Sequence, residues 1–287
     1  MTKLSLIVLS YNTQNVTKTC IQSIRKQYQH ELDSGEFEII LVDNASEDDS
    51  VAIIKQKFNN LKIIENKKNF GFSKGCNIGA SIARGQYLFF LNSDAQIGDG
   101  LEKMIAYADS DKQIGILGAK MENEDGSAQP SAGKFYTPFN VFLMLFGGEK
   151  IGMLRSSPKK ITNVDWVSGA AMMIRKDLFD ALHGFDENFF MYIEDMEICF
   201  RAKKKGYTVS FFPDIKVIHG HQGSSSRSFA IHNIYKGLLY FYKKHKSNME
   251  YTIIRRMLLT KACLAILIGF CTQNTYLTTT YRKAISF

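Results

Sequence analysis

Short polar clusters follow several apolar runs of this 287-residue chain, and the most informative contains one carboxylate. Asn92-Ser93-Asp94 comes directly after the apolar run 87–91. A carboxylate at a strand end suits a hard divalent cation such as Mg²⁺, which needs only one or two protein carboxylates when a diphosphate supplies the other oxygens. Asn, Ser and Asp also form ordinary turns, so a simple turn is the alternative.

A second cluster places three acids within four residues, at the predicted start of a helix. Glu194, Asp195 and Glu197 follow a segment rich in Phe, Met and Tyr, residues 185–192. Acids in a first helical turn complement the helix dipole, which is their structural interpretation. A carboxylate among apolar walls is also a plausible general base, which is their functional one.

Two histidines, His219 and His221, end a predicted strand before a Gly- and Ser-rich loop. Such a pair can ligate a metal or act on a proton, although single histidines are more often structural.

Glycines recur at every fourth position in residues 71–79, and Lys74 lies between them. This spacing matches neither a dinucleotide fingerprint nor a Walker loop. It suits a helix packed closely on a sheet. The functional alternative makes Lys74 or the helix N-terminus a partner for phosphate.

These clusters need a framework, and the first 120 residues alternate short buried strands with helices. We expect strands at 4–10, 37–42, 61–65, 86–91 and 113–120, and helices at 15–28, 46–58, 73–83 and 101–108. The alternation predicts an α/β fold with a doubly wound, mostly parallel sheet. Ligands bind past the carboxyl ends of such strands, where the polar clusters at residues 10–12, 43–46 and 92–94 lie.

The later chain is less regular, and no internal repeat is visible. Residues 121–165 are irregular, with an apolar patch at 139–146. Beyond them we expect strands at 166–174, 207–212 and 215–218, helices at 176–182, 193–205 and 231–245, and an apolar helical segment at 253–270.

The C-terminal segment carries the entire net charge of +8. Residues 229–287 contain nine Lys or Arg and one Glu, whereas residues 1–228 are neutral overall. The apolar run Met257–Phe270 is interrupted by Lys261 and is shorter than the roughly 20 residues that span a bilayer. We therefore expect the segment to lie on an anionic membrane surface. Packing on the domain and a homodimer contact are the alternatives, and a nucleic-acid partner is not expected.

Composition excludes several classes of protein. Hydrophobic residues make up 45% and charged residues 22%, as in an ordinary globular chain. The five cysteines are scattered without a C-x-x-C pair, which argues against a disulfide framework or a zinc knuckle and favours a reducing compartment. The first apolar run is too short for a signal peptide.

Together, these motifs resemble the inverting family 2 glycosyltransferases of the GT-A fold, and most closely the rhamnosyltransferase type of surface polysaccharide synthesis. The matching segments, in order, are Val8–Asn12, Val42–Ser46, Asn69 with Gly71-Phe72 and Asn77, Leu91–Asp94, and Gly184–Glu187 with Glu194-Asp195. Each motif is loose, but five in the right order are specific. The resemblance covers about residues 3–228.

The resemblance implies a role for each matching position. Tyr11 and Asp43 would line the nucleobase and ribose pocket, and Asp195 would be the catalytic base. Asp94 would bind Mg²⁺ or Mn²⁺, with His219 or His221 completing the site; Asn92 replaces the first acid of the family's D-x-D-type motif. The remaining donor-side residues would be Asn12, Asn69, Lys74, Asn92 and Ser93, and the acceptor side would include Trp166 and Glu194.

The implied fold is a GT-A domain with a Rossmann-like sheet over residues 1–228, followed by a basic helical extension, 229–287. Residues 1–120 would bind the nucleotide and 121–228 the acceptor. The implied activity transfers a sugar, rhamnose as the best candidate, from a dTDP- or UDP-sugar to a saccharide or lipid-linked saccharide, with inversion. The enzyme would be cytoplasmic and peripheral at the inner face of the cell membrane.

Two alternatives compete with this interpretation. A sugar nucleotidyltransferase should carry a Gly- and Arg-rich loop after its first strand, and residues 10–14 form none. A catalytically silent GT-A scaffold of a membrane-bound assembly would have no need for Asp94, Asp195 and His219, all of which are present.

Overall fold

The structure is a computed structural model that describes residues 1–58, 61–148, 152, 154–220 and 226–286. Its centre is a sheet in the order β10-β13-β6-β12-β4-β1-β2-β3, with β5 paired to β13 and β7 to β6. The core strands β1 to β4 are mutually parallel where they pair, and β12 runs antiparallel between β4 and β6. A small second sheet joins β11, β8 and β9.

The elements have the following bounds. The strands are β1 Leu4–Ser10, β2 Phe37–Asp43, β3 Lys62–Glu65, β4 Tyr87–Asn92, β5 Ala95–Ile97, β6 Ile114–Glu122, β7 Ala128–Gln129, β8 Ala132–Gly133, β9 Arg155–Ser156, β10 Thr162–Asn163, β11 Trp166–Val167, β12 Ala171–Arg175 and β13 Thr208–His219. The helices are α1 Gln14–Asp33, α2 Ser50–Lys57, α3 Gly71–Ser81, α4 Leu101–Asp109, α5 Pro138–Leu145, α6 Lys176–Ala181, α7 Glu194–Lys204, α8 Arg227–His245, α9 Asn248–Cys271 and α10 Thr275–Ala284.

Strand residues alternate between two hydrophobic cores, one on each face of the sheet. Ile7 and Phe90 face the core formed with α3, α6, α7 and α8, whereas Leu6 and Phe89 face the core formed with α1, α2 and α4. Successive side chains of a strand point to opposite faces, so a strand buried on both faces must be apolar throughout. This confirms the expected α/β fold with helices on both faces of a mostly parallel sheet.

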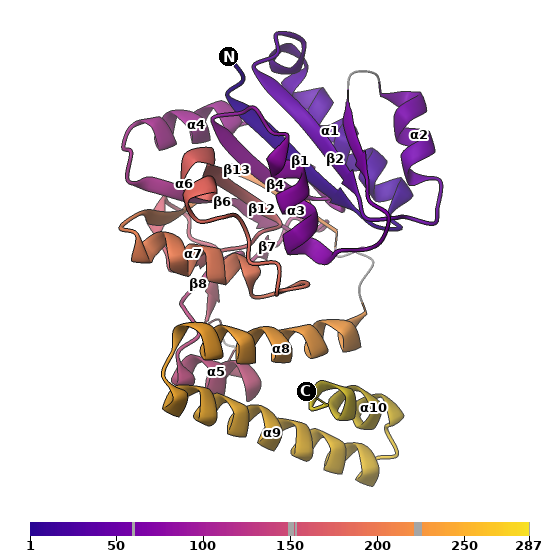
Figure 1. Cartoon of the computed structure of the whole chain (residues 1–287), viewed down its shortest axis with the longest axis vertical. Coiled ribbons are helices and arrows are strands. Elements are labelled where there is room, and N and C mark those ends of the chain that lie inside the picture. Colours follow the sequence, from indigo (N-terminus) through magenta and orange to yellow (C-terminus); the bar gives the residue numbers. More distant parts are fainter. Residues whose placement is uncertain (59–60, 149–151, 153, 221–225, 287) are drawn as a thin grey trace.

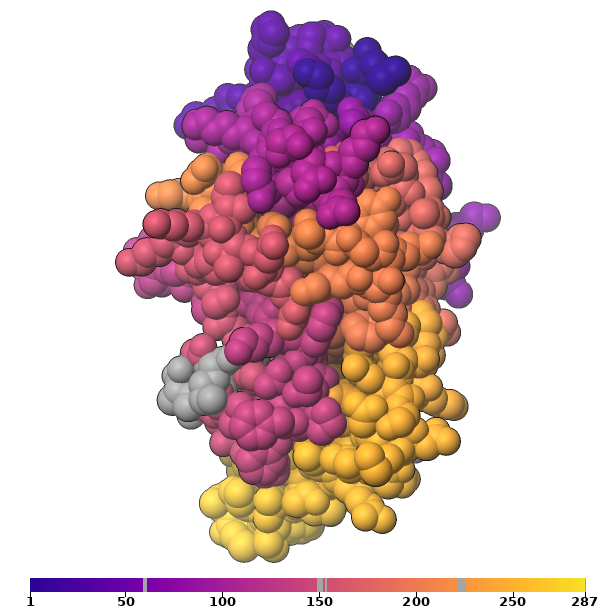
Figure 2. Space-filling view, turned by 90° about the vertical axis from the view of Figure 1, so that its left-hand side faces the viewer, coloured from indigo at the N-terminus to yellow at the C-terminus, as the bar shows by residue number. Residues whose placement is uncertain are grey.

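The C-terminal helices form a layer beyond this sheet (Figure 1). Helix α8 lies against α7, where the rings of Phe200 and Phe241 meet, and its Leu238 and Phe241 are fully buried in the same core as Phe90. Helix α9 packs on α5, α8 and α10. In the space-filling view, α5 and the C-terminal helices lie side by side at the end of the molecule away from the N-terminus (Figure 2). Among the described residues, no helix is long and apolar enough to cross a membrane.

Three segments differ from the elements expected from the sequence. The strand expected at 166–174 is interrupted between β11 and β12, where Ala171 N donates to the Ser168 carbonyl in a turn. The two strands expected at 207–218 form one strand, β13, with a shift in pairing between Phe212 and Lys216; Pro213, which has no N–H, lies at that shift. The apolar patch at 139–146 is largely helical, as α5.

A buried carboxylate joins α7 to α8. The Glu197 side chain is fully buried, and its oxygens accept hydrogen bonds from Arg201 at 2.8 Å, Lys244 at 2.9 Å and His245 at 2.8 Å. Burial by itself would raise the pKa of Glu197, but the hydrogen bonds from His245 and Arg201 outweigh it and hold the pKa at about 2. The charged carboxylate therefore stabilises the contact between the two helices.

We expect Glu197→Gln to reduce the free energy of unfolding at pH 7 by about 3 kcal/mol, because it leaves buried cationic partners without their carboxylate. The contribution of the Glu197 carboxylate to the free energy of unfolding is complete above the ordinary pKa of a glutamate and is lost as pH falls toward 2. The difference in stability between variant and wild type should therefore shrink in acid. Urea unfolding at pH 7 and pH 3 measures both effects. The control is Glu187→Gln, which breaks the exposed pair with Lys74 and should cost less than about 1 kcal/mol. An equal loss from both variants would contradict this account.

Candidate active site

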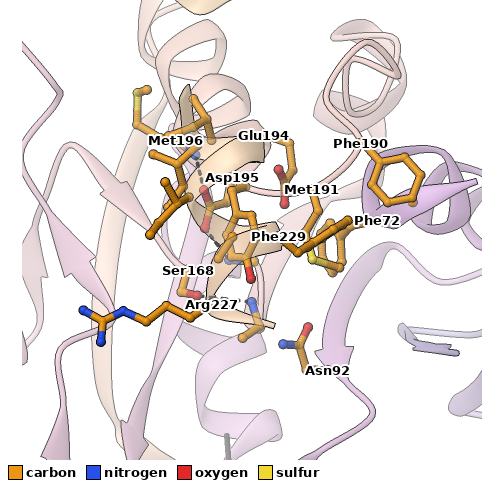
Figure 3. Close-up of a pocket in the computed structure, with 18 of the residues that line it drawn as sticks. Phe72, Asn92, Ser168, Phe190, Met191, Glu194, Asp195, Met196, Arg227 and Phe229 are labelled. Atoms are coloured by element: carbon orange, nitrogen blue, oxygen red, sulfur yellow. Dashed lines mark hydrogen bonds between the residues drawn. The ribbon is translucent and has the colours of Figure 1, made fainter. Parts of the chain in front are cut away.

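A cavity of about 1090 Å³ opens at the carboxyl ends of the central strands. Its walls come from β1, from the turn after β4, from the 168–170 turn, and from the starts of α7 and α8 (Figure 3). The carboxyl ends of parallel strands lie at one edge of the sheet, so the polar clusters that follow these strands meet there although they are far apart in sequence.

Asp94 and His219 lie together in this cavity. The short strand β5 pairs antiparallel with the end of β13, which sets His219 opposite Ala95. His219 Nε2 is consequently 3.2 Å from Asp94 Oδ1 and 3.2 Å from Asn92 Nδ2. Both Asp94 and His219 side chains are largely buried, with exposed fractions of 6% and 13%.

A strained turn positions the start of α7. Tyr192 and Ile193 both have positive φ, 71° and 72°. This left-handed conformation is unfavourable for a β-branched residue such as Ile193, and strain of this kind persists only where the surroundings enforce it. The Ile193 carbonyl accepts the Glu197 N–H at 2.8 Å, so the turn leads directly into the helix that carries Asp195.

Two glycines allow the close contacts that enforce this turn. A Cβ on Gly237 of α8 would lie 2.9 Å from Ile193 Cγ1, and one on Gly71 would collide with the Phe190 carbonyl. The Phe72 N–H donates to that same carbonyl at 2.6 Å. The loop before Asp195 is thus held between the start of α3 and the middle of α8.

The neighbouring acids Glu194 and Asp195 have different surroundings. The Asp195 carboxylate accepts hydrogen bonds from Gly169 N at 3.1 Å and Met196 N at 2.8 Å (Figure 3). Burial raises the pKa of Asp195, while these two donors and the nearby Arg155 charge act against the rise. Burial and the Asp195 charge raise the pKa of Glu194 well above its usual range. Glu194 Oε2 is buried with no hydrogen-bond partner among the described residues. Of the two, Asp195 is the better stabilised as a carboxylate.

Most of the residues predicted from sequence line this cavity. They are Tyr11, Asn69, Asn92, Ser93, Asp94, Trp166, Glu194, Asp195 and His219. Trp166 is fixed by a 2.9 Å hydrogen bond from its Nε1 to the Lys134 carbonyl.

The other predicted residues lie outside the lining of the main cavity. Asp43 lines a second, smaller cavity and accepts from Ser46 N and Oγ at 2.9 and 2.6 Å. Asn12 accepts from Glu47 N at 2.7 Å and so fixes the loop after β2. Lys74 forms an ion pair with Glu187 at 2.7 Å. His221 lies outside the described residues.

The cavity also contains residues that the sequence did not indicate. They are Arg155, Ser168, Arg227, Tyr235 and Lys261. Tyr235 and Lys261 belong to helices α8 and α9, whose sequences combine apolar residues with scattered cations. The spacing of these residues does not indicate a ligand site. Only the packing of α8 and α9 brings them to the cavity.

Comparison with known proteins places the chain in a family. The sequence model described as "Glycosyl transferase family 2" matches residues 5–182, well over half of the chain, and "Glycosyl transferase family group 2" matches residues 129–247. The chain belongs to glycosyltransferase family 2 and is therefore a glycosyltransferase.

Two curated relatives are named as rhamnosyltransferases. The N-acetylglucosaminyl-diphospho-decaprenol L-rhamnosyltransferase of Mycobacterium tuberculosis is 26% identical over 223 residues, covering 68% of this chain and 70% of the relative. Rhamnosyltransferase WbbL of Escherichia coli K12 is 25% identical over 236 residues, covering 78% and 85%.

Solved structures confirm the GT-A fold with a C-terminal helical part. TarS residues 1–349 of S. aureus, in complex with UDP-GlcNAc, is 19% identical with a TM-score of 0.61, covering 98% of this chain and 79% of that one. GalNAc-T7 with UDP, GalNAc and Mn²⁺ is 18% identical with a TM-score of 0.62, covering 84% and 50%. The chain spans 42% of the longer TarS chain.

Proposed function

We propose that the protein transfers a sugar, with rhamnose as the best candidate, from a dTDP- or UDP-sugar to a lipid-linked saccharide, with inversion of configuration. The observation that carries the proposal is one cavity that holds both the strand-end cluster Asn92–Asp94 and the buried carboxylate of Asp195. The first suits a nucleotide diphosphate and the second an acceptor hydroxyl. The names of the relatives support the sugar and the acceptor.

Asp195 acts as the general base in this proposal. An acceptor hydroxyl must lose its proton as its oxygen attacks the anomeric carbon, and a positioned carboxylate takes that proton. The nucleotide diphosphate leaves from the opposite face, so a single displacement inverts the configuration and needs no covalent intermediate. Glu194, the more strongly neutralised acid, lies on the acceptor side with Trp166.

The donor side fits a divalent cation. Asp94 supplies a carboxylate oxygen and His219 an imidazole nitrogen, 3.2 Å apart. No cluster of three His, Cys, Asp or Glu lies together in the described part of the chain. Two protein ligands suffice where a diphosphate completes the coordination, so the set fits Mg²⁺ or Mn²⁺. The bound ion would stabilise the negative charge that develops on the leaving diphosphate.

The nucleotide would lie against the ends of β1 and β2, with Tyr11, Asn69 and Ser93 on the cavity wall. Asp43 would contact the base or ribose from the second cavity, which it lines. Asn12 would act indirectly, by holding the loop after β2 through its hydrogen bond from Glu47 N. Residues 1–228 are proposed as the catalytic domain and 229–287 as its extension.

Attachment to an anionic membrane is the remaining part of the proposal. Large apolar side chains are exposed on α5 and α9, which pack on each other. They are Phe139, Phe142 and Phe146 with Leu264, Leu267, Ile268 and Phe270. Two basic residues of the C-terminal segment contact these side chains: Lys261 lies over the Phe146 ring and Arg282 over the Phe270 ring. Apolar side chains beside cations suit the boundary between headgroups and acyl chains of an anionic bilayer.

Asp195→Asn should reduce kcat by about 10²- to 10⁴-fold while donor affinity stays within twofold, because the variant cannot take a proton. Glu194→Gln, which mimics a protonated acid, should retain most of the activity. Since burial raises the pKa of Asp195, wild-type kcat should fall on acidification at a pH above the ordinary range of an aspartate. Initial rates with dTDP-rhamnose and a lipid-diphosphate-linked saccharide, with calorimetric donor binding, provide the test. An equal loss of donor affinity would place Asp195 in the donor site.

Removing Asp94 or the metal should abolish transfer, since the donor diphosphate loses its counter-charge. We expect Asp94→Ala to be inactive at all Mn²⁺ concentrations, and the wild type to be inactive in chelator and restored by Mn²⁺ or Mg²⁺. The control is Asp99→Ala, which removes an exposed acid five residues away. Full activity of wild type in chelator would refute the metal requirement.

The full chain should co-sediment with phosphatidylglycerol vesicles at low salt and be released as salt screens the charges. Truncation after residue 228 is a poor test because it removes Leu238 and Phe241 from the core. The double variant Leu267→Glu/Phe270→Glu should lose binding, whereas Ile82→Glu, which changes an exposed apolar residue outside the C-terminal segment, should not. A wild-type chain that stays in the supernatant would make this surface a packing or oligomer contact instead.

A further inference from the structure

The cavity extends beyond Asp195 to the C-terminal helices. This extension, here called the lower arm, is lined by Met144 and Leu145 of α5, Ile231, Ile234 and Tyr235 of α8, Lys261 of α9 and Tyr281 of α10. Its walls are mostly apolar, and α5 and α9, which supply part of them, also carry exposed apolar side chains. A sugar nucleotide bound at the strand ends does not account for an apolar arm.

One buried polar group of the lower arm, the Tyr235 hydroxyl, has no hydrogen-bond partner among the described residues. The Tyr235 side chain is only 3% exposed, and its buried hydroxyl makes no hydrogen bond within the described part of the chain. A buried hydroxyl left in this way costs free energy until a ligand or water satisfies it. Burial also raises the pKa of Tyr235, so the hydroxyl is a neutral donor.

Two cations accompany this hydroxyl. Lys261 interrupts the apolar run of α9, and its Nζ lies 5.5 Å from the centre of the Phe146 ring. Arg227, at the start of α8, lines the same cavity as Tyr281 of α10. Burial raises the pKa of Tyr281, and the Arg227 charge acts against that rise. Over the described ranges, neither cation forms an ion pair with a carboxylate. Two cations and a hydroxyl donor beside apolar walls suit an anionic, phosphate-bearing head on an apolar chain.

We propose that the lower arm binds the diphosphate and first isoprenoid units of a lipid-linked acceptor, with Arg227, Tyr235 and Lys261 contacting the diphosphate. This assignment rests on the proposed function. The order of groups along the cavity matches such an acceptor: Asp195 meets the sugar hydroxyl, the lower arm holds the diphosphate, and the α5 and α9 surface faces the lipid. The arm thereby makes the lipid diphosphate a determinant of acceptor choice.

Binding can be measured without knowing the full substrate, because Trp166 is the chain's only tryptophan and lines the same cavity. With a metal chelator present, titration with farnesyl diphosphate should change the fluorescence of Trp166 until binding saturates. Farnesol and inorganic diphosphate should each bind at least tenfold more weakly. Lys261→Met should weaken farnesyl diphosphate binding about tenfold and Tyr235→Phe several-fold. Lys243→Met, which removes an exposed cation of α8, should have no effect.

Three outcomes would overturn the proposal. Equal binding of inorganic diphosphate would show a simple phosphate site, and equal losses from Lys261→Met and Lys243→Met would show bulk electrostatics. Competition by UDP together with a loss in Asp94→Ala would place the probe in the donor site.

Transfer kinetics separate this proposal from the function on which it rests. Lys261→Met should raise KM for a lipid-diphosphate-linked saccharide at least tenfold more than for the same saccharide as an octyl glycoside. Equal changes in KM for both acceptors would overturn the proposal. A wild type that transfers to neither acceptor rejects the proposed function, and the fluorescence titration then decides by itself whether the lower arm is a lipid diphosphate site.

Discussion

The left-handed turn at Tyr192 and Ile193 is the constraint on which the site depends. A β-branched residue with φ of 72° is unfavourable in isolation, so neighbouring elements must hold it. The start of α3 holds the preceding loop through the Phe190 carbonyl, and α8 approaches Ile193 closely at Gly237. The buried Glu197 then joins α7 to α8 one turn later. The position of Asp195 is therefore fixed by a helix of the C-terminal layer as well as by the sheet.

The cavity contains charged side chains of both signs. Asp94 and His219 meet at the strand ends, and the cations Arg155, Arg227 and Lys261 come from β9, α8 and α9. Asp195 is buried, and backbone donors favour its charged form, whereas the pKa of Glu194 is raised so that its neutral form is favoured. One cavity thus holds the Asp94–His219 pair, the buried Asp195 carboxylate, and the side chains of Arg227 and Lys261.

Much of the fold could be predicted because its signals are local. The strands of the first 120 residues are buried on both faces and read as continuous apolar runs. Other elements depend on tertiary contacts. The strand expected at 166–174 is broken because β11 belongs to the small sheet and β12 to the central sheet, and Gly169 N in the turn between them donates to Asp195. Helix α10 has a polar, Thr-rich sequence with weak helix propensity, and it is held by packing, as between Tyr281 and Tyr235 of α8.

The sequence by itself determined which side chains end the strands, that Asp94 and Asp195 are candidate functional acids, and that the positive charge gathers after residue 228. The order of strands and polar clusters along the chain is enough for this, because the carboxyl ends of parallel strands lie at the same edge of a sheet. The tertiary structure decided which groups meet. The pairing of β5 with β13 joined Asp94 to a histidine 125 positions away, while an ion pair with Glu187 engaged Lys74 outside the cavity wall. Two backbone donors, Gly169 N and Met196 N, distinguished Asp195 from Glu194. Helix packing made Tyr235 and Lys261 part of the cavity lining. Such long-range contacts have no signature in local spacing, since each depends on the packing of elements far apart in the chain.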